Sequence, residues 1–341
     1  MAPDVATSTQ LSGFVNTRGV FGQHESADTA KDLKIMSMNK WNISHKGQHV
    51  ELGIAENNLF LMLSAAGLTA NLFGQRILPI GTLYDPFIAR GLDALTYGCY
   101  QNSRFMVVST PSGITLSPEG GAHQSINSPL IGMSQPGLVY LEPSYIDELQ
   151  VMMSWGLRYM QEAAGGSVYL RLSTRMLEQP RREMTDSLRE DILRGGYFHT
   201  QLSEATLPSE ETRVCIAFVG AVAPEAMEAA NILTEKLGKN SVSLLQVTSA
   251  DALYEDYHNN GDANTSHIQT LFQDVPKECV VVTVMDGAPT TLAWLGSVKG
   301  HKCRSHGVTQ FGQCGDVTDL YQHFNLDPQS LVQSAIKYVN K

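Results

Sequence analysis

A glutamate stands at the point where an apolar helical stretch of the chain begins. Glu56 ends the segment GIAE, and from Asn58 to Leu68 nearly every residue is apolar or small, which predicts a helix buried on most sides. An ionised carboxylate loses its hydration there, so it needs either a charged partner or a bound proton. The same pattern fits a helix-start acid that faces water and is favoured by the helix dipole. The spacing of residues in the sequence does not by itself decide whether Glu56 is a catalytic acid or a solvated side chain.

A glycine-rich loop carries a second group that could do chemistry. PSGITLSPEGGAHQS follows RFMVVST, residues 104–110, which reads as a buried strand. The loop places Glu119 and His123 close to three glycines, which let backbone approach a ligand closely. A histidine there can move a proton or bind an oxyanion, or it can be an ordinary solvated side chain. In open parallel sheets, ligands bind at the carboxyl ends of strands, where this loop begins.

Composition and missing motifs exclude several classes of function. The net charge of −10 argues against nucleic acid and anionic membranes as partners. There is no GxGxxG after a strand, no GxxxxGK[ST] and no GxSxG, so dinucleotide, P-loop and serine-hydrolase readings fail. The five cysteines include no CxxC pair, which indicates neither zinc nor a disulfide framework. With no apolar run of membrane-spanning length and no signal-like N-terminus, we expect a cytoplasmic protein.

Strands alternate with helices along the chain, which predicts α/β domains with largely parallel sheets flanked by helices. We expect two domains, 1–190 and 213–341, joined by a charged linker at 191–212. Ser144 and Asp147 form an S-x-x-D pattern and should cap the long helix that follows. The expected strands lie at 76–81, 104–110, 137–143, 167–173, 213–220, 242–248 and 279–287, and the expected helices of the first domain at 55–68, 85–99 and 144–161.

Several motifs, in order, resemble one enzyme superfamily. They are HVELGIAENNLFL, LYDPFIARGLDAL, TPSGITLSPEGGAHQS, VYLRLSTR, DGAPTTLAWLGSVKG and HGVTQFGQCGDVTDLY. The chain resembles the thiamine-diphosphate-dependent transketolase and 2-oxo-acid dehydrogenase superfamily, most nearly the homodimeric type of pyruvate dehydrogenase decarboxylating component. This resemblance implies a pyrimidine-binding domain followed by a transketolase C-terminal-like domain.

The resemblance also implies roles for particular residues. The acid that matches Glu56 hydrogen-bonds a ring nitrogen of the cofactor's aminopyrimidine and so activates the cofactor. The histidine that matches His123 holds or protonates the substrate oxygen. Tyr84 and Phe87 are candidates for the aromatic ring that packs on the pyrimidine, although both could be core residues. The flanking pair Glu119 and Gln124 would orient the histidine or contact the cofactor. Arg175 lies near the position where sugar-phosphate-using relatives have a phosphate-binding arginine. We nevertheless expect Arg175 to form a structural ion pair.

Half of the family's cofactor site has no counterpart in this sequence. The family binds diphosphate and Mg²⁺ through a GDG motif followed by NN, on a separate domain. This chain has only GDAN at 261–264 and MDGAP at 285–289. The resemblance also implies that the chain begins inside the pyrimidine-binding domain. The resemblance therefore implies no metal ligand here and a partner subunit that carries the GDG…NN domain. We expect a heterotetramer or other oligomer, although a fragment of a longer enzyme fits the same facts.

Three functions remain open from the sequence. The leading one is decarboxylation of a pyruvate-like 2-oxo acid, with transfer of the two-carbon acyl unit to a lipoyl group or another carrier. The second is transketolase-like transfer of a two-carbon ketol unit between sugars. The third is a non-catalytic regulatory or assembly subunit, against which the presence of both Glu56 and His123 weighs.

Overall fold

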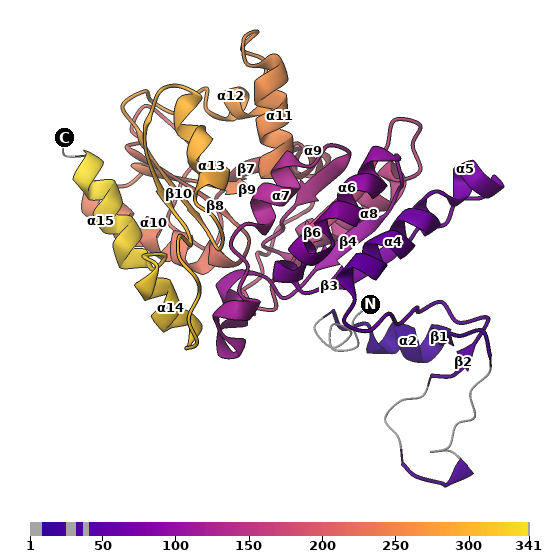
Figure 1. Ribbon diagram of the computed structural model, residues 1–341. Coiled ribbons are helices and arrows are strands. Elements are labelled where there is room, and N and C mark those ends of the chain that lie inside the picture. Colours follow the sequence, from indigo (N-terminus) through magenta and orange to yellow (C-terminus); the bar gives the residue numbers. More distant parts are fainter. Residues whose placement is uncertain (1–8, 25–31, 37–40, 340–341) are drawn as a thin grey trace.

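The structure is a computed structural model that describes residues 9–24, 32–36 and 41–339. A four-stranded and a five-stranded sheet, each covered by helices, form the body of the molecule (Figure 1). The predicted α/β class with largely parallel sheets is confirmed. A small N-terminal segment lies at one edge of this body; it consists of α2 (Ser12–Arg18), β1 (Val20–Phe21) and β2 (Ile43–Ser44).

The first sheet has the strand order β3, β4, β6, β5, and all of its strands are parallel. Apolar side chains of α4 and α6 cover one face, and those of α8 and α9 cover the other. Burial on both faces explains the continuous apolar strands. The elements are α4 (Glu56–Gly67), α5 (Thr69–Phe73), β3 (Ile80–Leu83), α6 (Leu92–Tyr100), β4 (Met106–Ser109), α7 (Ser128–Ser134), β5 (Leu138–Leu141), α8 (Ile146–Tyr159), β6 (Ser167–Arg171) and α9 (Asp186–Leu193).

The second sheet has the order β11, β10, β8, β9, β7, with only β7 antiparallel to its neighbour. Its three central strands are completely buried, in keeping with their valine-rich sequences. The elements are β7 (Gly196–His199), β8 (Val214–Val219), α10 (Ala223–Leu237), β9 (Val242–Val247), α11 (Ala250–Asn260), α12 (His267–Leu271), β10 (Val280–Met285), α13 (Thr290–Ala293), β11 (Lys302–His306), α14 (Val317–His323) and α15 (Pro328–Val339).

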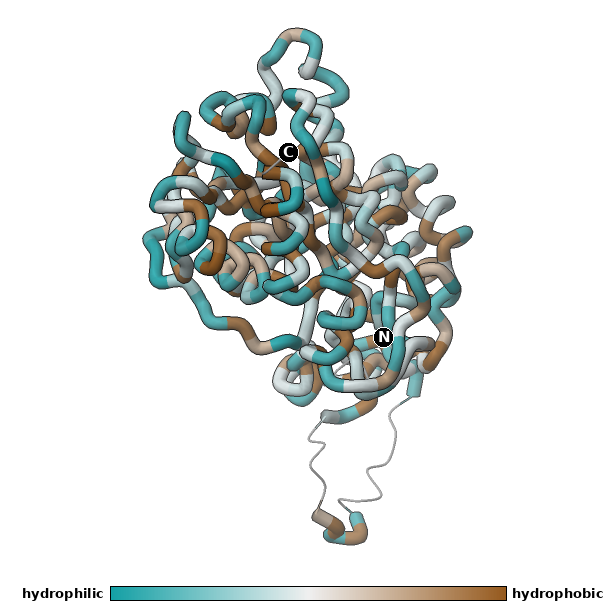
Figure 2. The backbone as a smooth tube through the Cα atoms, turned by 90° about the vertical axis from the view of Figure 1, so that its left-hand side faces the viewer, coloured by the Kyte–Doolittle hydropathy of each residue, from teal (hydrophilic) through white to brown (hydrophobic). Residues whose placement is uncertain are grey.

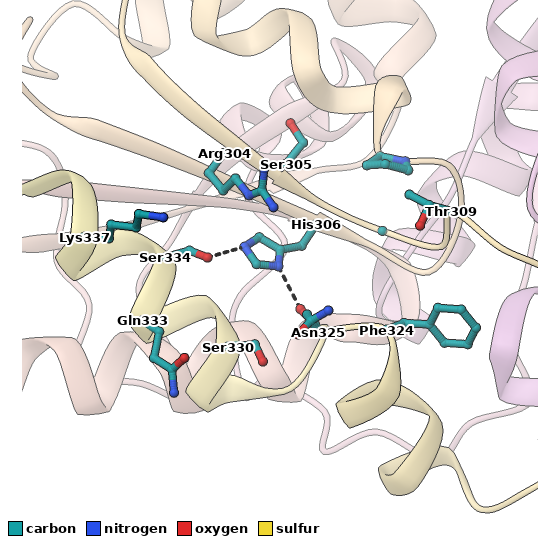
Figure 3. Close-up of a pocket in the computed structure, with 12 residues that line it drawn as sticks. Arg304, Ser305, His306, Thr309, Phe324, Asn325, Ser330, Gln333, Ser334 and Lys337 are labelled. Carbon is teal, nitrogen blue, oxygen red and sulfur yellow. Dashed lines mark hydrogen bonds between the residues drawn. The ribbon is translucent and has the colours of Figure 1, made fainter.

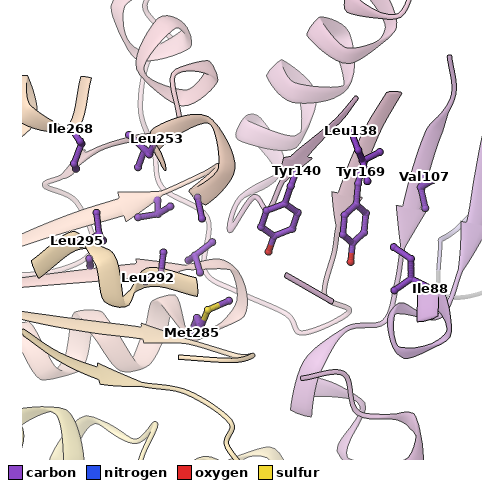
Figure 4. Close-up of a cluster of buried hydrophobic side chains, with 14 of the residues drawn as sticks. Ile88, Val107, Leu138, Tyr140, Tyr169, Leu253, Ile268, Met285, Leu292 and Leu295 are labelled. Carbon is purple, nitrogen blue, oxygen red and sulfur yellow. The ribbon is translucent and has the colours of Figure 1, made fainter. Parts of the chain in front are cut away.

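One apolar cluster runs through both sheets. Figure 4 shows it passing from Val107 and Leu138 of the first sheet to Leu253 and Leu295 beside the second. The backbone coloured by hydropathy shows the apolar stretches gathered inside and polar segments around them (Figure 2). This cluster therefore joins the two sheets, while a separate apolar cluster covers the other face of each sheet.

Two elements of the first sheet differ from the sequence-based expectation. β3 begins at Ile80, later than predicted, because Pro79 has no N–H to give to the ladder. The helix expected at 85–99 is divided into a 3-10 helix, η1 (Asp85–Gly91), and α6. In η1, Asp85 is directed into the buried interior.

The cap of α8 and the linker also differ from expectation. The predicted Ser144–Asp147 cap is wrong: Glu148 accepts the N–H groups of Ser144 and Tyr145 at 2.8 and 3.1 Å. The Ser144 hydroxyl instead donates to the carbonyl of Gly220, at 2.9 Å, and so joins the two sheets' loops. The stretch 191–212, expected as a linker, contains β7, which pairs with β9.

Two further findings bear on the class of protein. No helix in the described part of the chain is long and apolar enough to cross a membrane. All five cysteines are free thiols, and three of them are buried.

The joint between the sheets is made at β5, an edge strand of the first sheet. Tyr140 in β5 donates its N–H to Asp251 at 3.2 Å and accepts from the Ser249 hydroxyl at 2.6 Å. The N–H of Glu142 donates to the carbonyl of Thr248 at 2.9 Å. The edge strand is thus closed by the segment after β9, which satisfies its free backbone groups.

This joint should make stability depend on pH. Burial raises the pKa of Asp251 to about 7. The folded chain therefore holds this proton more tightly than the unfolded chain, and the stabilisation is lost as pH rises from the unfolded pKa, about 4, towards 7. Asp251→Asn keeps an acceptor for the N–H of Tyr140. We expect its free energy of unfolding, relative to that of the parent, to rise from pH 5 to pH 8 and to exceed that of the parent by about 1–4 kcal/mol at pH 8. Urea unfolding at both values measures this, with the exposed Asp262→Asn as control. A gain equal at both pH values would contradict it.

Candidate active site

The strands of the first sheet end on polar residues that meet in the interior. Asp85 follows β3, Ser109 ends β4, Glu142 follows β5 and Arg171 ends β6, and all four are buried. The Arg171 guanidinium donates to Asp85 at 2.8 Å and to Glu142 at 2.6 Å. The Ser109 hydroxyl donates to Asp85 at 2.5 Å. One cation therefore holds two carboxylates at the carboxyl edge of the sheet.

The buried cluster extends beyond these residues. Arg171 also donates to the backbone carbonyl of Asp286, at the end of β10, at 2.7 Å. Burial by itself raises the pKa of Asp85, but Arg171 and serine hydroxyls outweigh it, so that pKa lies below its usual value. For Glu142, burial raises the pKa although Arg171 opposes it. Further hydroxyl donors to the carboxylates are Ser125, Ser128, Tyr169 and Tyr140.

Asp286 anchors the start of the histidine loop. Its carboxylate accepts the N–H groups of Ile114 at 2.8 Å and Thr115 at 3.3 Å, and the Tyr321 hydroxyl at 3.2 Å. Gly113 has a φ of +61°, and a Cβ there would lie 2.4 Å from the Asp286 carboxyl carbon. Only glycine fits this approach. The aspartate of MDGAP is therefore an anchor between the sheets.

Glu56 begins α4 and is 8% exposed. Its carboxylate lies 3.7 Å from the guanidinium of Arg90, at the end of η1. The Arg90 side chain is 55% exposed and stacks over the Phe87 ring at 3.9 Å. Of the two readings of the sequence, the structure shows the buried acid with a charged partner.

Tyr84, Phe87 and His123 form one aromatic group. The ring centres of Phe87 and His123 are 5.5 Å apart, and those of Tyr84 and His123 are 6.5 Å apart, both edge to face. Because Arg90 joins Phe87 to Glu56, the acid and the histidine lie at opposite ends of a continuous set of contacts. Nδ1 of His123 is buried and has no hydrogen-bond partner within the described residues. Buried polar atoms are usually paired with protein or water, so this nitrogen is available to a partner from outside the described chain.

A segment after β11 packs on the loop that carries His123. Gln124 donates its side-chain N–H to the carbonyl of Gln313 at 2.7 Å, while its Oε1 is buried without a partner in the described chain. The thiol of Cys314 donates to the carbonyl of Pro118 at 3.3 Å. A Cβ on Gly121 would lie 2.0 Å from the carbonyl oxygen of Gly312, so the two backbones touch. The second sheet's loop thereby fixes the position of the histidine.

Two other predicted residues lie apart from this group. Glu119 is exposed, and no hydrogen bond or ion pair joins its side chain to another described residue. Arg175 makes a bidentate ion pair with Glu225, at 2.7 and 2.8 Å, and donates to the carbonyl of Ala221 at 2.8 Å. The structural ion pair expected for Arg175 is present.

Sequence reasoning missed the residues that hold the site together. Arg90 follows Phe87 by three positions in FIAR, a spacing that places side chains on neighbouring turns of a helix. Arg171, 86 positions from Asp85, is the last residue of a strand, as are other site-forming residues in parallel sheets. A basic residue at the end of a strand with the buried-type sequence SVYLR was the available signal.

The chain is similar in sequence to known enzymes over nearly its whole length. The pyruvate dehydrogenase E1 component of Escherichia coli K12 is 23% identical over 345 residues, covering 98% of this chain and 38% of that protein. The one from Haemophilus influenzae is 25% identical, covering 100% and 39%. A probable transketolase of Schizosaccharomyces pombe is 20% identical, covering 87% and 38%. No protein-family model matches. The chain thus spans about two fifths of the length of the curated relatives it matches.

The solved structures agree on the fold. Transketolase from Leishmania mexicana has a TM-score of 0.67 at 17% identity, covering 99% of this chain and 45% of that one. A split-gene transketolase, solved as an inactive beta4 tetramer, has a TM-score of 0.62 at 16% identity, covering 97% and 95%. The resemblance to the transketolase and 2-oxo-acid dehydrogenase superfamily is confirmed.

The buried cluster predicts a large loss of stability when its cation is removed. Arg171→Met leaves Asp85 and Glu142 buried without a cation, which should lower the free energy of unfolding by about 3–5 kcal/mol. Urea denaturation measures the loss. Adding Glu142→Gln should recover part of it, because one buried charge is then removed.

The matched control is Arg194→Ala. Arg194 makes an exposed pair with Glu190, at 3.9 Å, so its loss should cost less than about 1 kcal/mol. Equal effects of the Arg171 and Arg194 substitutions would show that the buried cluster does not stabilise the fold.

Proposed function

We propose that this chain is a subunit of a thiamine-diphosphate-dependent enzyme that decarboxylates a pyruvate-like 2-oxo acid. The enzyme would pass the two-carbon acyl unit to a lipoyl group or another carrier. The observation that carries the proposal is the buried Glu56 at the start of α4, linked through Arg90 and Phe87 to a histidine with an unpaired buried nitrogen. The similarity to pyruvate dehydrogenase E1 components supports this reaction over the others of the superfamily.

The residues fit the pyrimidine side of the cofactor. A carboxylic acid at a buried helix start suits a hydrogen bond to a ring nitrogen. The Phe87 ring, over which Arg90 lies, would offer an aromatic face for a planar ring, and the buried Tyr84 stacks beside it. When bound, thiamine diphosphate supplies the carbanion chemistry that side chains lack. Arg90 is mostly exposed, so it can turn away from Glu56 when a ligand enters.

His123 would work on the substrate. Its unpaired Nδ1 is available to hold or transfer a proton at the oxygen of the 2-oxo group, where charge develops. Gln124 is fixed by the carbonyl of Gln313, and its amide oxygen packs against Gly312, so its role would be to keep the loop in place. Glu119 is exposed, and we keep it only as a candidate for contact with the cofactor at the edge of the site.

The diphosphate and Mg²⁺ would be held by a partner subunit. Within residues 9–24, 32–36 and 41–339, no group of three or more His, Cys, Asp or Glu side chains is placed to hold a metal ion. The chain matches 95% of a split-gene transketolase chain but less than half of the full-length relatives. We therefore propose a two-chain enzyme, assembled as a heterotetramer or another oligomer. We also propose that residues 1–190 and 213–341 are two domains and that the enzyme is located in the cytoplasm.

An exposed apolar surface offers a place for that partner. Monomeric proteins rarely expose contiguous apolar patches of large size. Here exposed apolar side chains follow one another along the chain from just before α4, through α5 and β3, to the end of α6. Ile54 and Leu92 lie near the Glu56 end of α4, and the series continues towards its other end. The exposed side chains are Ile54, Leu61, Met62, Leu72, Phe73, Ile77, Leu78, Ile80, Leu92, Tyr97 and Tyr100. The proposed occupant is the subunit that completes the cofactor site.

Transketolase-like ketol transfer is the second candidate. The likeness to a split-gene transketolase over nearly its whole length favours it. Both reactions would use Glu56 and His123 in the same way. They differ in the substrate pocket, so only an assay separates them.

The assay uses the chain combined with a partner that co-purifies from its source and carries GDG…NN. We expect turnover of pyruvate, not of ketose phosphates, and a loss of about 10²–10⁴-fold in kcat for Glu56→Gln, since the acid can no longer share its proton. The exposed Glu51→Gln is the matched control and should keep full activity. Turnover of ketose phosphates alone would establish the second candidate. Undiminished activity of Glu56→Gln would indicate the non-catalytic role.

The division of the cofactor site predicts how thiamine diphosphate binds. The isolated chain should not bind it tightly with Mg²⁺, because it offers only the pyrimidine side; the two-chain complex should. Isothermal titration calorimetry of each, with and without Mg²⁺, measures this. Tight, Mg²⁺-dependent binding by the isolated chain would overturn the division.

A further inference from the structure

A polar cavity lies outside the candidate active site, between the end of β11 and α15. Its volume is about 360 Å³, within the usual range for small-molecule sites. Figure 3 shows side chains from both elements directed into it, among them Arg304, His306, Ser334 and Lys337. None of its lining residues belongs to the Glu56–His123 group.

The charged residues that line the cavity are all cations. Arg304 and Lys337 line it, and no Asp or Glu does, in a chain with 34 acidic and 24 basic residues. Neither cation has an ion pair or side-chain hydrogen bond with another described residue. Arg304 lines the cavity from β11 and Lys337 lines it from α15 (Figure 3). An anion bound in the cavity could form charge-assisted hydrogen bonds with either cation.

The floor of the cavity is fixed by His306, which is 7% exposed. Nδ1 lies 2.7 Å from the carbonyl oxygen of Asn325 and Nε2 lies 2.9 Å from the Ser334 hydroxyl. A carbonyl can only accept, so Nδ1 carries the proton. Burial lowers the pKa of His306, which keeps the ring neutral, so Nε2 accepts from Ser334.

This arrangement determines which groups of a ligand the cavity can bind. The Ser334 proton is used by His306, and the Ser330 hydroxyl donates to Asp327 at 2.5 Å. Both serine oxygens can still accept a hydrogen bond. The cavity therefore combines two cations for an anionic group with two oxygen acceptors for hydroxyl groups.

We propose that this cavity is a binding site for a small hydroxylated organic phosphate. The phosphate would lie between Arg304 and Lys337, and ligand hydroxyls would donate to Ser330 and Ser334. An arginine is well suited to this contact, since its planar guanidinium binds a phosphate through two hydrogen bonds. The site does not depend on the proposed enzyme activity.

The test is isothermal titration of the purified chain with glycerol 3-phosphate and with inorganic phosphate. We expect saturable binding with one site per chain, tighter for glycerol 3-phosphate than for inorganic phosphate. Arg304→Gln and Lys337→Gln should each weaken binding at least tenfold, and Ser334→Ala should remove the advantage of glycerol 3-phosphate. Both cations are exposed, so their substitution should leave the fold intact, which circular dichroism checks.

The matched control is Lys302→Gln. Lys302 is an exposed cation on the same strand as Arg304 but does not line the cavity, so this variant should bind like the parent. Absence of saturable binding up to about 1 mM ligand would overturn the proposal. Equal weakening by Lys302→Gln would also overturn it, because binding would then follow general surface charge.

Discussion

The buried guanidinium of Arg171 joins the two sheets of this molecule. It bonds the carboxylates of Asp85 and Glu142 and the backbone carbonyl of Asp286, so three strand ends are held by one side chain. Removing ions from water is expensive, and the cost is offset only when geometry and further hydrogen bonds satisfy every charge. Hydroxyl donors to the carboxylates supply those bonds. The carboxyl edge of the first sheet is consequently a rigid base for the residues that follow each strand.

The candidate site is built on that base. Asp85 begins η1, which presents Phe87 and Arg90, and Arg90 contacts Glu56. Ser125, another member of the cluster, comes two residues after His123 and bonds the N–H of Gly113 at the other end of the loop. Both sides of the acid–histidine pair are therefore positioned by the same buried charges, although neither residue belongs to the cluster.

The second sheet contributes to the site without supplying a reacting group. Asp286 holds the start of the histidine loop, and the segment around Gln313 covers its end. Gly307 and Thr309, at the start of that segment, line the polar cavity between the end of β11 and α15. The proposed binding site and the proposed active site are thus served by one stretch of chain after β11, and a split enzyme would retain both within this subunit.

The α/β class and the apolar helix that begins at Glu56 were predictable from the sequence. The resemblance to a known superfamily added the site candidates Glu56, His123, Tyr84 and Phe87. These follow from local patterns: continuous apolar strands, helical periodicity and short motifs. Three other features appear only in the folded chain. Arg90 pairs with Glu56, Arg171 bonds Asp85, and the stretch expected as a linker contains β7, which pairs with β9. The reason is physical. Such contacts join residues far apart in the chain, and their strength comes from exclusion of water, which exists only once the sheets have packed.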